Sequence, residues 1–184
     1  MVMAMQTQQK WAFGADENTA YLWKPEGLGG EYEIVGEEGV VIYQDTAGDE
    51  TGQFAQMHFL TQGDRINPTT GTITWNTDKI ACEAGPVPQS SDSIFGGVSY
   101  RTTSLAMARA PAGFPLDNYH GEPAVQVKMT RVGNTVSMCG PSGESFANLF
   151  VQQYRDVQGG SSKPIGWVNT AQPELPLDHI WERD

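Results

Sequence analysis

The chain has 184 residues, of which 39% are hydrophobic, and it carries 22 acidic and 11 basic side chains for a formal net charge of −11. Five Trp, seven Phe and six Tyr supply enough large side chains for a hydrophobic core, which argues against a wholly disordered chain. The acidic balance argues against a nucleic-acid binder, and no run approaches the ~20 apolar residues of a membrane span.

The acidic side chains are concentrated early in the chain, since residues 26–50 hold eight of them and no Lys or Arg. This run predicts a solvated face, with a cation site or a docking face for a basic partner as the alternative. The first nine residues, MVMAMQTQQ, lack the charged and apolar regions of a secretory signal. We therefore expect an intracellular or virion-associated protein, unless a signal has been removed or export uses another route.

The two cysteines, Cys82 and Cys139, lie far apart and in no zinc-binding pattern. They permit one disulfide but do not require it. We expect two free, partly buried thiols.

Gly and Pro occur 21 and 11 times and divide the chain into short segments that suit strands better than long helices. In chain order, the sequence predicts a hairpin of strands 31–35 and 40–43 around the turn 36–39. It then predicts a strand over 54–60 and another over 72–75, which follows the turn 67–71. Residues 98–107 are typical of one long strand, or of two strands separated by a bulge.

The clearest alternation of apolar and polar residues lies in 125–138. It predicts a hairpin whose tight turn is Gly133-Asn134, because Asn tolerates the positive φ that such a turn requires. The next apolar residues recur at helical spacing between 145 and 159, namely Phe146, Leu149, Phe150 and Tyr154. This spacing predicts a helix, with a buried strand as the alternative.

Eight to ten short strands and at most one short helix predict an all-β fold. The length favours a two-sheet antiparallel β-sandwich of the jelly-roll type, and a closed antiparallel β-barrel is the alternative. We expect residues 1–184 to form a single β domain, with an N-terminal arm (1–10) and a Pro-rich C-terminal tail (172–184) as extensions.

A family resemblance comes from the segment 125–146. The pieces Arg131-Val-Gly-Asn134 and Ser142-Gly-Glu-Ser-Phe146 resemble the strand, turn and tip of concanavalin A-like (laminin-G-type) jelly rolls. The resemblance covers 22 of the 184 residues. That family includes glycan-binding modules, adhesion domains, hydrolases and lyases, so it implies a fold and a ligand class rather than one activity.

Candidate catalytic residues are few, because the chain has three histidines. Gln56 and His58, two apart on a strand, share a face and can reach one sugar. They resemble the Gln-x-His strand of jelly-roll alginate lyases, where the His takes a sugar-ring proton and the Gln stabilises the carboxylate. The Arg-rich upstream strand of those lyases is missing, since no Arg precedes Arg65. His120 is a second candidate acid or base.

Candidate binding residues lie in a Pro-flanked loop and in strands. Asn118, Tyr119, His120 and Glu122 offer an amide, a ring, an imidazole and a carboxylate within five residues. Trp75 and Tyr100 are further rings that can stack on a sugar, although core packing is the alternative for each. Three carboxylates around a Gly turn, namely Asp45, Asp49 and Glu50, could supply oxygen ligands for Ca²⁺.

These observations favour a module that binds a glycan or another small polar ligand through loops at the edge of a jelly roll. Two alternatives stay open. The chain could be a structural subunit of a homo-oligomer or larger assembly such as a virion or filament, with ordered termini. It could also be a small lyase, isomerase or cyclase that uses His58 or His120 in a pocket.

Overall fold

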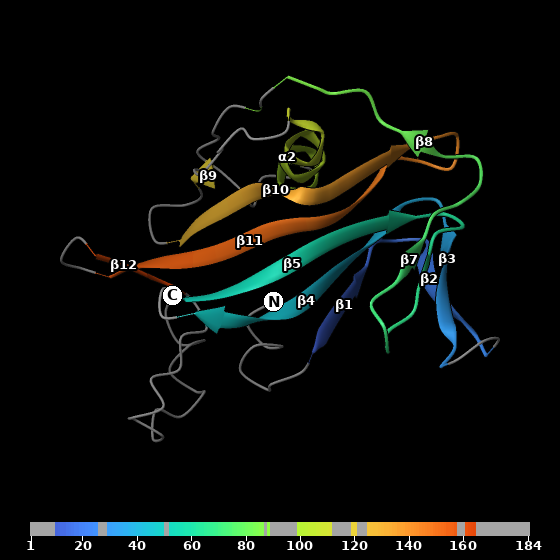
Figure 1. Ribbon diagram of the computed structural model, residues 1–184, viewed down its shortest axis with the longest axis horizontal. Coiled ribbons are helices and arrows are strands. Elements are labelled where there is room, and N and C mark those ends of the chain that lie inside the picture. Colours follow the sequence, from blue (N-terminus) through green and yellow to red (C-terminus); the bar gives the residue numbers. More distant parts are fainter. Residues whose placement is uncertain are drawn as a thin grey trace.

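An eight-stranded antiparallel sheet runs through the middle of the computed structural model, which describes residues 10–25, 29–49, 52–86, 88, 99–111, 119–120, 125–157 and 161–164. Its main strands lie side by side in Figure 1, in the order β1 (Trp11–Ala15), β4 (Gly39–Asp49), β5 (Gly52–Thr61), β11 (Ser145–Val157), β10 (Val125–Cys139) and β8 (Ile80–Ala81). Two short strands extend it, since β9 (Tyr119–His120) pairs with β10 and β12 (Ser161–Pro164) pairs with β11.

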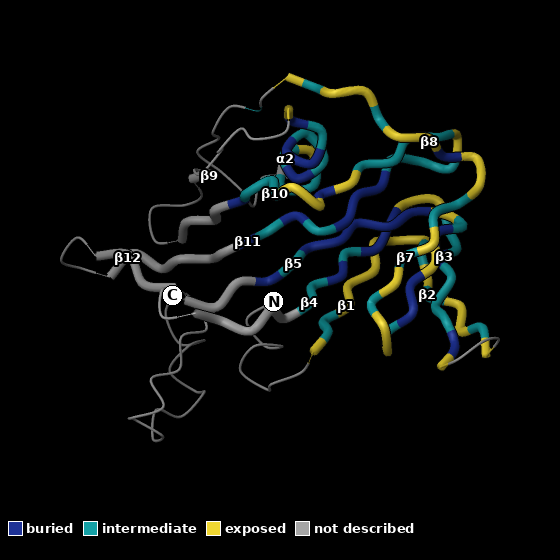
Figure 2. The backbone as a smooth tube through the Cα atoms, in the orientation of Figure 1, coloured by how far each residue is buried: buried dark blue, intermediate teal, exposed yellow. Residues whose placement is uncertain are grey.

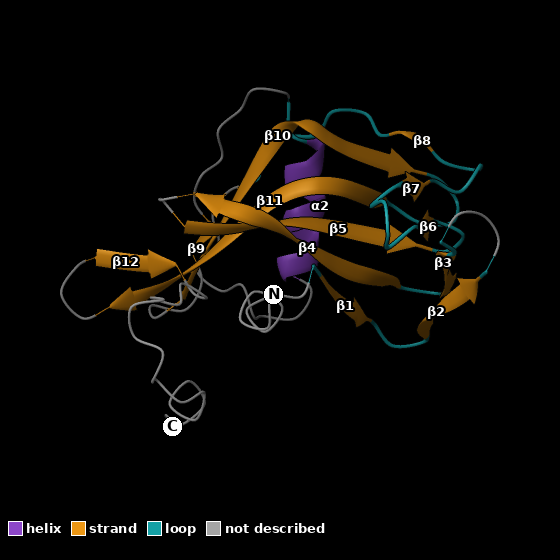
Figure 3. Cartoon of the chain, turned by 60° about the horizontal axis from the view of Figure 1, so that its bottom comes forward, coloured by secondary structure: helices purple, strands orange, loops and turns teal. Residues whose placement is uncertain are grey.

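A second antiparallel sheet has four strands, in the order β2 (Thr19–Lys24), β3 (Glu31–Gly36), β6 (Arg65–Ile66) and β7 (Ile73–Thr74). The described part of the chain has one helix, α2 (Ser99–Arg109), and it packs against β10 and β11 (Figures 1 and 3). The mostly β fold with two antiparallel sheets is as predicted. The closed barrel is wrong, because β1 and β8 end the strand order of the large sheet without pairing with each other in the described residues.

Alternate residues of a strand point to opposite sides of a sheet. In the large sheet, each side contributes residues to a hydrophobic core. One hydrophobic core lies between the two sheets and contains Ile34, Val40, Ile42, Leu60 and Ile66. The other lies between the large sheet and α2 and contains Met57, Phe59, Met107, Ala108, Met129, Phe146, Leu149 and Val151. Figure 2 shows the buried segments along β5 and β11, the two strands in the centre of the sheet.

The strands predicted at 31–35 and 40–43 exist as β3 and β4, but they do not form the predicted hairpin. β3 pairs with β2 and β6, whereas β4 pairs with β1 and β5. The segment between them therefore carries the chain from the small sheet to the large one. Gly36 begins this corner with a φ of 134°, and a Cβ there would lie 2.1 Å from the carbonyl oxygen of Asn18.

The hairpin predicted within 125–138 is also wrong. β10 is one strand from Val125 to Cys139, and Gly133-Asn134 lies in an irregularity of its pairing with β11 between Arg131 and Val136. The chain turns only afterwards, between Cys139 and Ser145, and Gly143 has the positive φ of that turn, 108°. Side chains satisfy the backbone at the irregularity, where Thr135 Oγ1 accepts from Val132 N–H and donates to the carbonyl of Asn148.

Helix and strand are exchanged in two predicted segments. The stretch 145–159, for which a helix was expected, contains strand β11, so the strand alternative is confirmed. The stretch 98–107, expected as strand, contains most of α2. Ser104, Met107 and Ala108 of α2 are buried. Residues three and four positions apart lie on one face of a helix, which here faces the core. No helix of the described residues is long and apolar enough to cross a membrane.

Cys82 and Cys139 form a disulfide, which overturns the expectation of free thiols. Cys139 pairs with Ile80 across β10 and β8, and Cys82 N–H donates to the carbonyl of Ser137 at 3.0 Å. This pairing brings the two Cα atoms to 5.0 Å although the cysteines are 57 residues apart in sequence. The spacing of the two cysteines in the sequence does not predict this contact.

Candidate functional site

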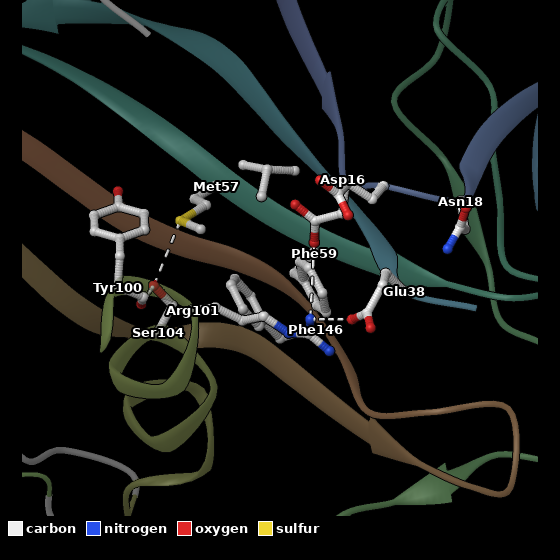
Figure 4. A pocket seen from close by; sticks show the side chains of 11 residues that line it. Asp16, Asn18, Glu38, Met57, Phe59, Tyr100, Arg101, Ser104 and Phe146 are labelled. Atoms are coloured by element: carbon white, nitrogen blue, oxygen red, sulfur yellow. Dashed lines mark hydrogen bonds and ion pairs between the residues drawn. The ribbon is translucent and has the colours of Figure 1, made fainter. Parts of the chain in front are cut away.

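A pocket of about 660 Å³ opens between α2, the large sheet and the turns at one end of β1 and β4. Its lining comes from five separate stretches of the chain, namely Asp16, Glu17, Asn18, Glu38, Val41, Met57, Phe59, Tyr100, Arg101, Ser104 and Phe146. Figure 4 shows Asp16, Asn18 and Glu38 on one side of the pocket, with Tyr100, Arg101 and Ser104 of α2 opposite them.

The floor of the pocket is apolar and aromatic. Phe59 of β5 and Phe146 of β11 stack with ring centroids 6.1 Å apart, and both side chains are almost fully buried. Gly39 makes room for this arrangement, because a Cβ at that position would lie 2.3 Å from Cζ of Phe59. The floor thus depends on a glycine at the start of β4 and on the pairing of Phe59 with Phe146.

The rim of the pocket is charged. The guanidinium of Arg101 lies over the Phe59 ring at 5.0 Å from its centroid and pairs with the Glu38 carboxylate at 2.5 Å. Asp16 lies 3.8 Å from the same guanidinium nitrogen. With Glu17, three carboxylates line the pocket against one guanidinium, so its formal charge is −2. The side chains of Asp16, Glu38 and Arg101 are all partly exposed, so a ligand in the pocket can contact them.

The α2 side of the pocket is held by neutral hydrogen bonds. Ser104 Oγ donates to the carbonyl of Tyr100 at 2.8 Å and lies 3.8 Å from the sulfur of Met57. The hydroxyls of Tyr100 and Tyr43 are 3.0 Å apart. Burial raises the pKa of both tyrosines, so both phenols stay protonated at neutral pH. These bonds fix the first turns of α2 against the sheet.

Of the residues predicted as binding residues, Tyr100 lines this pocket and Trp75 does not. Trp75 follows β7 and packs against the core between the sheets. Core packing was the alternative expected for this ring. Tyr119 and His120 form β9, whose backbone pairs with Val127 and Gln126 of β10. Asn118 and Glu122 lie outside the described residues.

The predicted catalytic pair, Gln56 and His58, does share one face of β5, and that face points toward the second sheet. His58 is 1% exposed. Its Nδ1 accepts from Asn148 N–H at 3.3 Å, so Nε2 carries the ring proton, and Nε2 has no hydrogen-bond partner in the described residues. Burial lowers the pKa of His58 to about 4, which keeps the imidazole neutral.

The predicted calcium ligands are at the far end of β4. Asp45 and Asp49 belong to this strand, and Asp49 pairs with Gly52 across the turn to β5. The side chains of Asp45 and Asp49, and all of Glu50, lie outside what the structure describes.

A second polar cluster is buried, with Thr61, Asp64, Lys79 and Ser145 all among the buried polar residues. Lys79 Nζ donates to Asp64 Oδ2 at 2.6 Å, to Ser145 Oγ at 2.7 Å and to Thr61 Oγ1 at 2.7 Å. The side chains of Lys79 and Asp64 are 0% exposed. A Ser hydroxyl beside a Lys amine is a nucleophile arrangement in some enzymes, but here no substrate can reach it. We interpret the cluster as structural.

The pocket residues that sequence reasoning missed are Glu38, Phe59 and above all Arg101. Arg101 lies in a segment expected as strand, and its partners come from two turns at least 63 positions away in sequence. No protein-family model matches the chain, and no solved structure matches it. The fold and the pocket define the class, a mostly β protein of two antiparallel sheets with an acidic pocket in the described part of the chain.

Proposed function

We propose that this protein is a ligand-binding module of the jelly-roll β-sandwich type, and that the pocket beside α2 receives a saccharide. The observation that carries the proposal is the combination of an aromatic floor with a rim rich in hydrogen-bond acceptors. Sugar hydroxyls donate to carboxylate and amide oxygens, and the C–H face of a pyranose packs on apolar rings. A volume of about 660 Å³ lies within the usual ~300–1,000 Å³ of small-ligand sites.

The charge of the rim selects among saccharides. Asp16, Glu17 and Glu38 outnumber Arg101, and the whole chain carries −11. A negative pocket in a negative protein repels uronates and sialic acids and attracts protonated amines. We therefore expect amino sugars to bind best, neutral sugars less tightly and acidic sugars least.

Calorimetric titration with three oligosaccharide series of equal length tests this proposal. The probes are oligomers of glucosamine, of N-acetylglucosamine and of a uronic acid. Glu38→Gln should weaken glucosamine binding by about tenfold, the effect of one charged hydrogen bond. Arg101→Gln should strengthen it, because this substitution makes the pocket more negative and uncovers the Phe59 ring. Glu33→Gln, on the second sheet and outside the pocket, is the matched control.

The opposite signs of the two pocket variants make the test sharp. Uronate oligomers that bind as well as glucosamine oligomers would exclude the proposed selectivity. Binding that responds equally to Glu33→Gln and Glu38→Gln would move the site away from the pocket. If no oligosaccharide binds at millimolar concentration, the saccharide proposal itself is wrong.

A second candidate function, a subunit of a larger assembly, is supported by apolar side chains at the surface. Phe13, Leu22 and Trp23 are 42%, 44% and 46% exposed on β1 and β2. The Phe13 and Trp23 rings both contact the Tyr32 ring, and exposed apolar groups that lie close together favour a protein contact. Size-exclusion chromatography with light scattering tests this candidate, with Trp23→Ser as the variant that should dissociate an oligomer. Repeating the run with EDTA tests whether Ca²⁺, predicted at Asp45, Asp49 and Glu50, holds an assembly together.

The third expectation, an enzyme with His58 or His120 as acid or base, gains no support from the described residues. The His58 ring is buried and its pKa is low. Proton exchange with a solvent-borne substrate needs an accessible nitrogen.

A further inference from the structure

The disulfide lies beside a carboxylate. The two Sγ atoms of Cys82 and Cys139 and one carboxylate oxygen of Glu144 all lie within 4.8 Å of one another. The pairing of β8 with β10 brings the two cysteines together, and Glu144 lies in the turn between β10 and β11. None of the three residues lines the pocket beside α2, so this cluster is a separate feature of the molecule.

Glu144 is poorly satisfied where it lies. Its Oε1 is shielded from solvent and has no hydrogen-bond partner in the described residues. Its Oε2 lies 3.5 Å from Nη1 of Arg109, the last residue of α2. Burial raises the pKa of Glu144 and Arg109 opposes this effect. A shielded acceptor atom without a partner is unfavourable in a folded protein and calls for a role.

We propose that reduction of the Cys82–Cys139 disulfide creates a zinc site whose protein ligands are the two thiolates and the unpartnered oxygen of Glu144. Thiolate and carboxylate are both ordinary zinc ligands, and three protein ligands leave the fourth tetrahedral position to water. Oε2 of Glu144 keeps its ion pair with Arg109, which orients the carboxylate as an outer partner of a ligand does.

The chemistry balances with an external reductant such as a dithiol or a phosphine. The S–S bond takes up two electrons and two protons and becomes two thiols, and the reductant is oxidised. Zn²⁺ then binds both sulfurs as thiolates and two protons leave to solvent. A sulfur in the disulfide has no thiolate charge to offer, so disulfide and zinc site exclude each other. The site is therefore filled under reducing conditions and closed under oxidising ones.

Cobalt substitution of the full chain tests the site. After reduction with a phosphine and its removal, Co²⁺ should bind one equivalent and give a thiolate-to-cobalt charge-transfer band. Zn²⁺ should displace Co²⁺ stoichiometrically. The oxidised protein should show no band. Cys82→Ser should abolish the band, and Glu144→Gln should weaken Co²⁺ binding by about tenfold or more.

Glu83→Gln is the matched control, because Glu83 follows Cys82 but its exposed carboxylate is not part of the cluster. Equal binding by oxidised and reduced protein, or unchanged affinity in Glu144→Gln, overturns the proposal. Circular dichroism is recorded in parallel, because reduction removes a cross-link. If the reduced chain unfolds, addition of Zn²⁺ should refold it, and failure to refold also overturns the proposal.

Discussion

Lys79 is surrounded by three oxygens in the interior, and its ammonium group has no contact with solvent. Asp64 also accepts from the backbone N–H groups of Thr61 and Asn76 at 3.0 and 2.9 Å. The pair therefore joins three loops through charge and hydrogen bonds. A buried charge that loses its partner is strongly destabilising, whereas an exposed pair contributes little.

Replacing Lys79 by Met should lower the free energy of unfolding by about 3–5 kcal/mol, because it leaves Asp64 charged and uncompensated. The control is Lys24→Met, which breaks a partly exposed pair with Glu33 at 3.5 Å and should cost about 1 kcal/mol or less. Urea unfolding at pH 7 measures both values. Similar losses in the two variants would mean that the buried Lys79–Asp64 pair contributes no more to stability than an exposed ion pair.

His58 makes stability depend on pH in a defined direction. Its pKa is lowered from 6.5 to about 4 in the folded protein, so the unfolded chain takes up a proton between these values and the folded chain does not. The contribution of His58 to stability is therefore full above pH 6.5 and is lost as the pH falls toward 4. The difference between these two pKa values corresponds to about 3 kcal/mol of unfolding free energy.

His58→Asn should remove this component of acid sensitivity. An Asn oxygen can still accept from Asn148 N–H, which isolates the titration from the hydrogen bond. Between pH 7 and pH 4, the variant should lose about 3 kcal/mol less unfolding free energy than the unchanged protein. Urea titrations at pH 7, 5.5 and 4 measure the difference. Parallel pH profiles would show that His58 already titrates normally.

At the scale of elements, period-two alternation predicted strands correctly where pairing is regular. The strand at 54–60 lies in β5, and the turn at 67–71 closes through an Asn67 carbonyl that accepts from Gly71 N–H before β7. The error at 145–159 arose from a bulge. Phe146 pairs with Phe59 and Leu149 with Met57, so residues three apart share one face of a strand. Such spacing is indistinguishable from one helical turn.

The position of the real turn can be tested with two glycines. Gly143 has a φ of 108°, and a Cβ there would lie 3.0 Å from Thr61 Oγ1. Gly143→Ala should therefore lower the free energy of unfolding by about 1–3 kcal/mol. Gly133, in the predicted turn, has no atom within 4 Å of an added Cβ. Gly133→Ala should change stability by about 0.5 kcal/mol or less. Thermal unfolding that ranks them the other way would favour a hairpin at Gly133.

At the scale of the whole molecule, sequence could not predict the pocket because no local pattern encodes it. The turn after β1 supplies Asp16, the corner before β4 supplies Glu38, and α2 supplies Arg101. Tyr100 was predicted as a binding ring from its residue type, and it lines the pocket from a helix instead of a strand. The disulfide and the buried Lys79–Asp64 pair likewise depend on strand order, which short-range periodicity does not specify.

Because one sheet serves both cores, the described part of the molecule should unfold as one unit. β5 contributes Leu60 to the core between the sheets and Phe59 to the core beneath α2.

Ile34→Ala and Met129→Ala remove a side chain from one core each, and each should lower the free energy of unfolding by about 2–5 kcal/mol. In both variants, unfolding followed by backbone circular dichroism and by tryptophan fluorescence should coincide, although Trp11 and Trp75 pack only on the core between the sheets. A fluorescence transition that stays at its original midpoint in Met129→Ala would mean that the helix layer unfolds separately, and that the large sheet does not couple the two cores.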